Sequence, residues 1–410
     1  MSSLILHNTN LALNHVQFDV TGSKSISQRA LIIHSLMGLP LKIQGLSDSD
    51  DTLVLLKALS SSDYNINVQY AGTALRFLLA LFAYRNQAVI LTGQETLFNR
   101  PIEALIKALN SLGAQIIKQH NFIHIKKSNL HGGVVNFDDI KSSQFISSLL
   151  LIAPYLKDGL TLNLPSKYNS KSYVCLTTSM MLQCGARLIS NNSSIKVLPH
   201  SYTKGIVDIE SDWTSVSYLF VAFLFSDLKT IQIRSFLNNS LQPDSIVADF
   251  FTILGVKTNY KNNNLILEKI NNITIPNKIE WSFENNGDLF PAIIVACVGL
   301  RINLLATGIH TLAYKESNRI VSMTTELSKF NCVFSIEQQS VYMDSSMSNS
   351  SMQKNIISID TYQDHRIALS LAPLVLLNWD LKISNFEIVN KSYPNFWLDL
   401  VKFGVKIKKQ

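Results

Sequence analysis

One supersecondary pattern recurs six times along the chain and restricts the folds open to it. In each copy a polar residue precedes an apolar helix, which is followed by a short β-rich run, an amphipathic helix and one or two further strands. From the second copy onward the starts of the apolar helices are separated by 70, 70, 76 and 76 residues. Such a period is typical of repeated supersecondary units. The predicted starts are Ser25, Gly72, Ser142, Asp212, Asp288 and Asp364.

The β-rich run that follows each apolar helix is predicted to form a strand. These runs occupy residues 39–45, 88–93, 160–165, 230–236, 302–308 and 381–386. A chain of 410 residues exceeds the size at which one core keeps growing, so we expect two domains of three units each. The predicted fold class is α/β (α+β), with residues 22–210 in the first domain and residues 1–21 plus 211–410 in the second.

Charge and composition narrow the classes of ligand. The net charge is +7 and the pI is about 9.0, but the basic residues are scattered, which favours small anionic ligands over nucleic acid. The four cysteines have no CxxC spacing and lie in apolar segments, so we expect buried, reduced thiols in a cytoplasmic protein. No signal peptide, membrane span, metal-ligand spacing or nucleotide-binding motif is found, and we expect a soluble monomer without metal or cofactor.

The first helix start, in TGSKSISQR, combines a hydroxyl at Ser25 with cations at Lys24 and Arg29. Exposed backbone NH groups and the helix dipole make such a start suitable for a phosphate or a carboxylate. Taken alone, the same residues also fit ordinary capping of the helix.

The next helix starts of the first half repeat the theme with other polar groups. Gly72 would let a ligand approach the backbone, with Arg76 one turn further on, and Arg100 is expected just before Pro101 at the first position of a helix. Ser142, Ser143 and Gln144 open the third apolar helix, and Ser170 and Tyr173 lie at the start of its amphipathic partner. Each could also be a structural cap.

In the second half, Asp288 is expected to open an apolar helix. Lys315 and Arg319 are four residues apart, so on one helix face they would repel each other unless an anion lay between them. We favour a structural role for His365 over a functional one. Lys391 precedes the last helix.

Together these motifs resemble the 5-enolpyruvylshikimate-3-phosphate (EPSP) synthase family. The resemblance spans the chain and rests on GSKSISQR, AGTALR, NRPIEAL, SSQF, SKSY, DLFPA, YKESNR, DHR and KSYPNFW in the family's order. It implies two inverse α/β barrel domains, each made of three βαβαββ-type units, that close over the substrates. It also implies a reaction in which phosphoenolpyruvate donates its enolpyruvyl group to the 5-hydroxyl of shikimate 3-phosphate.

The resemblance further implies a role for each matching residue. Asp288 would accept the proton of the 5-hydroxyl, and Glu316, with Lys24 as a possible partner, would handle the proton at the methylene carbon. The residues expected to bind shikimate 3-phosphate are Lys24, Ser25, Arg29, Ser142, Ser143, Gln144, Ser170, Asp288 and Lys315. Those expected to bind phosphoenolpyruvate are Lys24, Gly72, Arg100, Gln144, Arg319, Arg366 and Lys391, while Arg76, Tyr173 and His365 are possible contacts.

One departure and two alternatives accompany this interpretation. Tyr70 stands before AGT, where the family usually has a small or polar residue. We expect the protein to be sensitive to glyphosate, an inhibitor that occupies the phosphoenolpyruvate site, and Tyr70 is the residue most relevant to that expectation. The related UDP-N-acetylglucosamine enolpyruvyl transferases normally carry a reactive Cys in the loop that reads GQETLFNRP here. An inactive repeat protein that binds an anionic metabolite is the second alternative.

Overall fold

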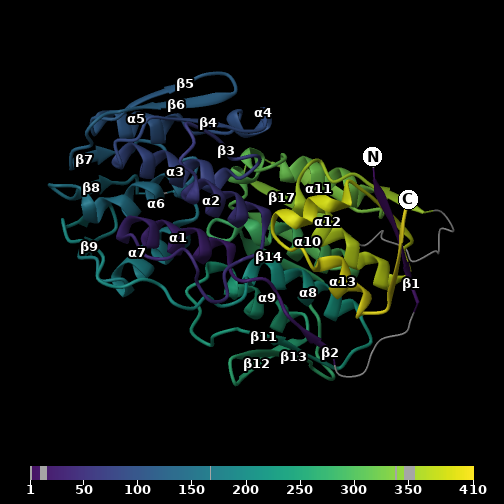
Figure 1. Cartoon of the computed structure of the whole chain (residues 1–410). Coiled ribbons are helices and arrows are strands. Elements are labelled where there is room, and N and C mark those ends of the chain that lie inside the picture. The colour runs from purple at the N-terminus through teal and green to yellow at the C-terminus, as the bar shows by residue number, and fades with distance from the viewer. Residues whose placement is uncertain (1, 10–15, 167, 338, 346–355) are drawn as a thin grey trace. The chain divides into compact units, whose positions relative to one another are not determined.

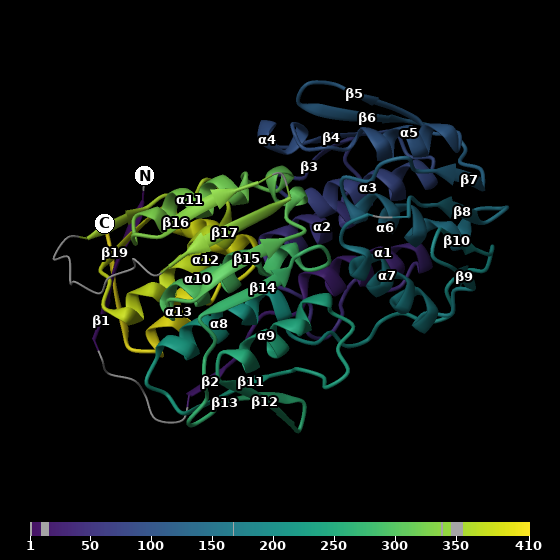
Figure 2. The ribbon, with the colours of Figure 1, turned by 180° about the vertical axis from the view of Figure 1, so that it is seen from behind.

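The computed structural model describes residues 2–9, 16–166, 168–337, 339–345 and 356–410, and the chain divides into two compact units. The first unit comprises Met1–Gly22 and Glu210–Gln410, and the second comprises Ser23–Ile209. The two units are coloured along the chain in Figures 1 and 2.

In its described residues, the unit Ser23–Ile209 contains two four-stranded sheets around apolar helices. The sheets have the orders β3 (Asn65–Asn67), β4 (Val89–Thr92), β6 (Phe122–Lys126), β5 (Gln115–Lys118), and β7 (Gly133–Asn136), β8 (Leu160–Asn163), β10 (Ser194–Val197), β9 (Leu188–Ser190). The helices are α1 (Lys24–Met37), α2 (Asp50–Ser60), α3 (Gly72–Tyr84), α4 (Glu95–Phe98), α5 (Glu103–Ser111), α6 (Ser143–Ile152) and α7 (Lys171–Gln183), with a 3-10 turn η1 (Ala153–Tyr155). Both views show α1, α3 and α6 in the interior of this unit, with β4–β6 on one side and β8–β10 on another.

The part of the other unit that the structure describes contains three four-stranded sheets. Their orders are β12 (Val256–Lys261), β13 (Asn264–Lys269), β11 (Thr230–Arg234), β2 (Val16–Phe18); β14 (Lys278–Ser282), β15 (Asn303–Thr307), β17 (Ser340–Asp344), β16 (Val333–Ile336); and β18 (Ile357–Ile359), β19 (Leu381–Ser384), β1 (Ser3–Asn8), β20 (Val405–Lys409). Because β1 pairs with both β19 and β20, the two ends of the chain lie side by side (Figure 1).

The helices of this unit are interrupted by short 3-10 segments. The α-helices are α8 (Trp213–Phe225), α9 (Val247–Ile253), α10 (Phe290–Gly299), α11 (Arg319–Ser328), α12 (His365–Leu371) and α13 (Phe396–Val401). The 3-10 segments are η2 (Pro243–Ile246), η3 (Gly287–Leu289), η4 (His310–Tyr314), η5 (Ala372–Leu377) and η6 (Phe386–Lys391). Every residue of α10 except Gly299 is buried, which explains why this helix is apolar on all sides.

Four of the sheets follow the chain order strand, helix, strand, helix and then a hairpin or a single strand. In each, two parallel strands are joined by an inner apolar helix, as in β3 and β4 across α3 or β14 and β15 across α10. In the fifth, β2 and β11 are also parallel, although Ser23–Ile209 lies between them in sequence. A parallel pair needs such a crossover, whereas the antiparallel pairs β5–β6 and β12–β13 need only short turns.

The prediction of a strand at residues 39–45 is wrong. This segment forms one isolated bridge, between Gln44 and Asp208, and no ladder. Pro40 lacks a backbone donor, and Gly45 has a left-handed φ of +69° that ends an extended run. The helix α2 follows this segment and leads to β3, which pairs with β4 of the next unit. The strand after α2 therefore does not pair with residues 39–45.

The prediction that all four cysteines are buried is also wrong for one of them. Cys175 is exposed on α7, whereas Cys184, Cys297 and Cys332 are buried. Burial raises the pKa of the Cys184 thiol to about 11 and that of Cys332 to about 12, so both are protonated at neutral pH.

Gly45 allows a stability test with an internal control. A Cβ on Gly45 would lie 2.2 Å from the Ile209 carbonyl oxygen, whereas a Cβ on Gly38, at φ +68°, would meet nothing within 4 Å. We expect Gly38→Ala to lower the free energy of unfolding by about 1 kcal/mol through the backbone alone. Gly45→Ala should cost about 1–3 kcal/mol more through overlap. Urea unfolding checks this, and equal losses in the two variants would contradict the close approach.

Candidate active site

In the unit that includes Glu210–Gln410, the carboxylate of Asp288 contacts three cations. Its Oδ1 lies 3.3 Å from Lys315 Nζ and 2.7 Å from an Arg319 nitrogen, and its Oδ2 lies 2.9 Å from an Arg366 nitrogen. Asp288 belongs to the 3-10 turn η3, which leads directly into the inner helix α10 at Phe290. The prediction that it opens the helix is therefore wrong, because α10 begins at Phe290 and the Asp288 side chain turns to the cations.

Two more carboxylates share the same cations. Glu316 accepts a hydrogen bond from Arg319 at 2.6 Å and lies 3.6 Å from Lys391 Nζ. Asp364 accepts from Arg319 Nε at 2.8 Å and also caps α12 by accepting from the Arg366 backbone NH at 3.0 Å. The cluster therefore holds three carboxylates and the four cations Lys315, Arg319, Arg366 and Lys391.

The charges of this cluster control the proton affinities. Burial alone would raise the pKa of Asp288, but the charges of Arg366, Lys315 and Arg319 hold it well below its usual value. Burial likewise opposes the charge of Arg319, and Asp364, Glu316 and Asp288 overcome it, so the pKa of Arg319 is raised. Asp288 is therefore ionised and is a weak base in this arrangement.

The prediction that Lys315 and Arg319 share one helix face is wrong. Lys315 follows η4 in an extended conformation, and Arg319 is the first residue of α11. Their cationic groups nevertheless meet at one atom, Asp288 Oδ1. The anion that their like charge requires is thus supplied by the protein itself.

His365 and Tyr218 border the cluster. His365 is fully buried at the start of α12, with Nδ1 3.8 Å from Asp364 Oδ1. Arg366 donates to the Tyr218 hydroxyl at 3.2 Å, and burial raises the pKa of that phenol to about 12.

In the unit Ser23–Ile209, Arg29 is a buried cation that donates to neutral groups. Its guanidinium donates to the Thr177 hydroxyl at 2.7 Å, the Ser147 hydroxyl at 3.3 Å, and the backbone carbonyls of Ser25 and Tyr173 at 2.8 and 3.3 Å. Burial lowers its pKa to about 10, and within the described residues no carboxylate forms an ion pair with it.

The other two groups of the first helix start lie beside it. Lys24 is the first residue of α1, and its Nζ lies 3.1 Å from Asp51 at the start of α2. Ser25 is half-buried in the first turn of α1, whose N-cap is Ser23. Ser23 accepts from the Ile26 backbone NH, so ordinary capping is performed by a residue other than Ser25.

Gly72 is approached closely by two guanidinium groups. A Cβ at this position would lie 2.7 Å from an Arg100 nitrogen and 2.8 Å from an Arg76 nitrogen. Arg76 is held by the carbonyls of Gly72 and Pro101, at 2.8 and 2.9 Å. Pro101 does not open the next helix as predicted, because α5 begins at Glu103 after the N-cap Ile102.

The start of α6 faces the start of α3. Ser142 is the N-cap and accepts from the Gln144 backbone NH, and Gln144 Nε2 donates to Thr73 at 2.8 Å. Among the described residues, the buried Oε1 of Gln144 has no hydrogen-bond partner, so an acceptor is left over at this helix start. Ser143 is buried beside it.

The remaining predicted contacts lie at the start of α7. Ser170 is its N-cap at a left-handed φ of +59°, and its side chain makes no capping hydrogen bond. A non-glycine residue in this region costs on the order of 1 kcal/mol, which the surrounding structure must offset. Tyr173 contributes its carbonyl to Arg29.

The partners of the predicted cations were not identified from the sequence. Asp51, Ser147, Thr177 and Asp364 hold Lys24, Arg29 and Arg319, but they lie 27, 118, 148 and 45 residues away in the chain. Asp364 was placed only as a helix start. No periodicity connects residues so far apart.

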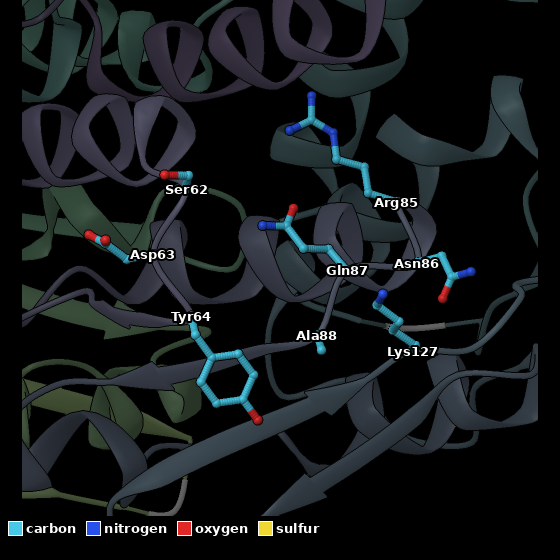
Figure 3. Close-up of a pocket in the computed structure, with 8 residues that line it drawn as sticks. All are labelled: Ser62, Asp63, Tyr64, Arg85, Asn86, Gln87, Ala88 and Lys127. Carbon is cyan, nitrogen blue, oxygen red and sulfur yellow. The ribbon is translucent and has the colours of Figure 1, made fainter.

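A pocket of about 550 Å³ in the same unit lies apart from these residues. It is lined by the segments after α2 and α3 and by the end of β6, and its side chains include Tyr64, Arg85 and Lys127. Figure 3 shows that Tyr64 and Arg85 point in different directions and do not converge on one point. The pocket does not gather groups around one ligand.

No group of three or more His, Cys, Asp or Glu side chains that could hold a metal ion was found in the described ranges. In the same ranges, every helix is too short or too polar to cross a membrane.

Comparisons with known proteins agree on one family. The family model described as EPSP synthase (3-phosphoshikimate 1-carboxyvinyltransferase) matches residues 56–400. The chain is 35% identical over 396 residues to the 3-phosphoshikimate 1-carboxyvinyltransferase of Bacteroides fragilis (strain YCH46), covering 95% of each protein. It is 27% identical over 414 residues to the enzyme of that name from Aliivibrio fischeri (strain MJ11), covering 93% of this chain and 95% of the relative.

Solved structures share the fold. The EPSP synthase of Acinetobacter baumannii superposes with a TM-score of 0.76 at 18% identity, covering 100% of both chains. The enolpyruvyl transferase NikO of Streptomyces tendae gives a TM-score of 0.74 at 13% identity, covering 100% of this chain and 99% of the other. The predicted class, an inverse α/β barrel fold in two parts, is confirmed by these likenesses.

Proposed function

Because the chain belongs to the EPSP synthase family, we propose that it transfers the enolpyruvyl group of phosphoenolpyruvate to the 5-hydroxyl of shikimate 3-phosphate. The products are 5-enolpyruvylshikimate 3-phosphate and inorganic phosphate, on the route to chorismate and the aromatic amino acids. The observation that supports this most is that Asp288 and Glu316, two candidate proton-transfer groups, both contact the buried Arg319, at 2.7 and 2.6 Å.

The reaction needs proton transfers at two atoms, the 5-oxygen and the methylene carbon, and no covalent bond to the enzyme. As the 5-oxygen attacks the enol carbon, its proton passes to Asp288 and the methylene carbon gains a proton, which makes it a methyl group. Breaking the bond between the former enol carbon and the phosphate oxygen then releases phosphate, and loss of one methyl proton restores the double bond. Glu316, with Lys24 as a possible partner, handles the protons at the methylene carbon.

The cations serve to bring two anionic substrates together. Two like unit charges 4 Å apart repel by about 4 kcal/mol at an effective dielectric of 20. Arg29, with Ser25 and Lys315, is assigned to shikimate 3-phosphate, and Arg100 and Arg366 to phosphoenolpyruvate. The other residues assigned to shikimate 3-phosphate are Lys24, Ser142, Ser143, Gln144, Ser170 and Asp288, and those assigned to phosphoenolpyruvate are Lys24, Gly72, Gln144, Arg319 and Lys391.

Substrate binding would also activate the base. In the structure Asp288 is a weak base because Lys315, Arg319 and Arg366 hold it. When phosphate and carboxylate groups of the substrates share these cations, less positive charge remains for Asp288 and its proton affinity rises. The base would therefore gain strength only when its substrates are present.

The two alternatives predict different behaviour. A UDP-N-acetylglucosamine enolpyruvyl transferase would need the loop cysteine that residues 93–101 lack. A protein that only binds an anionic metabolite would have no use for Asp288 and Glu316 in contact with one guanidinium. We also propose that the enzyme acts as a monomer, which the mass in solution tests.

Phosphate release tests the reaction and the role of Asp288 together. We expect the wild type to release inorganic phosphate only when both substrates are present. Asp288→Asn should lower kcat by about 10²–10⁴-fold, because the proton acceptor is lost, while shikimate 3-phosphate still binds. Binding of both substrates by the wild type without phosphate release would contradict the proposed reaction, and unchanged turnover in Asp288→Asn would remove its role.

Glyphosate tests the assignment of the phosphoenolpyruvate residues around Gly72. We expect inhibition that raises the apparent KM for phosphoenolpyruvate and leaves kcat unchanged, because glyphosate would compete for the same residues. Gly72 has no side chain, so the guanidinium groups of Arg76 and Arg100 can lie against its backbone. Tyr70, which is 40% exposed, is the one departure nearby. Tyr70→Asn measures its effect, and a wild-type rate unaffected by excess glyphosate at low phosphoenolpyruvate would contradict the assignment.

A further inference from the structure

Asp244 is a buried carboxylate that the roles above do not include. It lies in η2, only 1% of its surface is exposed, and its Oδ2 accepts a hydrogen bond from the Thr214 hydroxyl at the start of α8. Its Oδ1 accepts from Asn286 Nδ2 at 3.3 Å. Burying a carboxylate is costly, so one retained at this depth calls for a reason.

Asn286 connects Asp244 to the proposed catalytic base. The Asn286 amide also donates to the Pro243 carbonyl at 2.7 Å, so two acceptors of η2 fix its side chain. The backbone carbonyl of Asn286 accepts from the Leu289 backbone NH at 2.9 Å, and this hydrogen bond forms the turn that presents Asp288. The position of Asp288 is thus tied to Asp244 through one amide side chain.

Charge provides a second connection. Burial and then the negative charge of Asp288 raise the pKa of Asp244 to about 6, against the opposing effects of Thr214, Arg366 and Asn286. The interaction of two charges is reciprocal, so an ionised Asp244 must raise the proton affinity of Asp288. The other charged groups that act on Asp288 are Arg366, Lys315, Arg319 and Glu316.

We infer that Asp244 is a positioning residue for Asp288: through Asn286 it holds the turn that presents the base, and through its negative charge it strengthens that base. The inference rests on the proposed function, in which Asp288 accepts the proton of the 5-hydroxyl. Above about pH 6 Asp244 is ionised, and its negative charge makes Asp288 a stronger base than it would be beside a neutral group. Below about pH 6 Asp244 takes up a proton and Asp288 becomes a weaker base.

Asp244→Asn tests this with little change of shape. The new amide can accept from Asn286 through its oxygen and donate to the Thr214 hydroxyl, so both hydrogen bonds survive while the charge is lost. We expect kcat to fall about tenfold at pH 7.5, equivalent to one pKa unit of lost base strength, with KM for both substrates within about twofold. The part of the kcat–pH profile that rises near pH 6 should disappear.

Asp249→Asn is the matched control, because Asp249 is an exposed carboxylate on α9, five residues from Asp244. It makes the same change of charge and should leave kcat and its pH profile as in the wild type. A kcat–pH profile of Asp244→Asn that coincides with that of the wild type would overturn the inference. Wild-type phosphate release in the same assay separates this outcome from failure of the proposed function.

Thr214→Val gives a second test that keeps Asp244 in place. The Thr214 hydrogen bond lowers the pKa of Asp244, so its removal should move the rise near pH 6 to higher pH. A profile that does not move, in a variant with wild-type melting temperature, would overturn the electrostatic role even if Asp244→Asn failed to fold.

Discussion

A buried guanidinium must find hydrogen-bond acceptors, because removing it from water without them costs several kcal/mol. Two buried arginines meet this requirement in different ways. Arg319 is surrounded by the carboxylates of Asp288, Glu316 and Asp364, which raise its pKa. Arg29 donates to hydroxyls and backbone carbonyls, and burial lowers its pKa to about 10.

This difference suits two different tasks. The carboxylates around Arg319 already neutralise much of its charge, and two of them, Asp288 and Glu316, are the proposed proton-transfer groups. We propose that the charge of Arg29 serves an anionic ligand; Arg29 lies on α1 one turn after Ser25, whose carbonyl accepts from its guanidinium. A buried cation that donates to neutral groups favours an anionic ligand, so the same constraint accounts for the proposed acid–base groups and for the proposed anion-binding role of Arg29.

The repeated fold explains why polar residues far apart in sequence occupy equivalent helix starts. In each βαβαββ unit the inner helix follows the first strand, so its polar start recurs at one end of the unit. Helix starts therefore offer backbone NH groups at the same place in each repeat. A single substitution at such a start gives that helix a side chain of different chemistry. Gly72, Ser142 and Asp364 are three such specialisations.

Much of this could be predicted from the sequence, because apolar runs and capping residues are local signals. Five of the six predicted runs after the inner helices became strands, β4, β8, β11, β15 and β19. The run at 39–45 failed because a strand needs partners, which local pattern does not reveal. The 3-10 turn at Asp288 and the break between Lys315 and Arg319 were missed because ion pairs with distant residues determine them. Asp244 was missed because its hydrogen-bond donors Thr214 and Asn286 lie 30 and 42 residues away in the chain.

The affinity for shikimate 3-phosphate tests most directly whether the charge of Arg29 is reserved for a substrate. Arg29→Met should fold, because Ser147 and Thr177 still hydrogen-bond to each other at 2.8 Å, and calorimetry should show a dissociation constant raised about 100-fold. Arg85→Met is the control, since Arg85 is held by Ser35 and should leave the affinity unchanged. Equal affinities of Arg29→Met and the wild type would contradict the account.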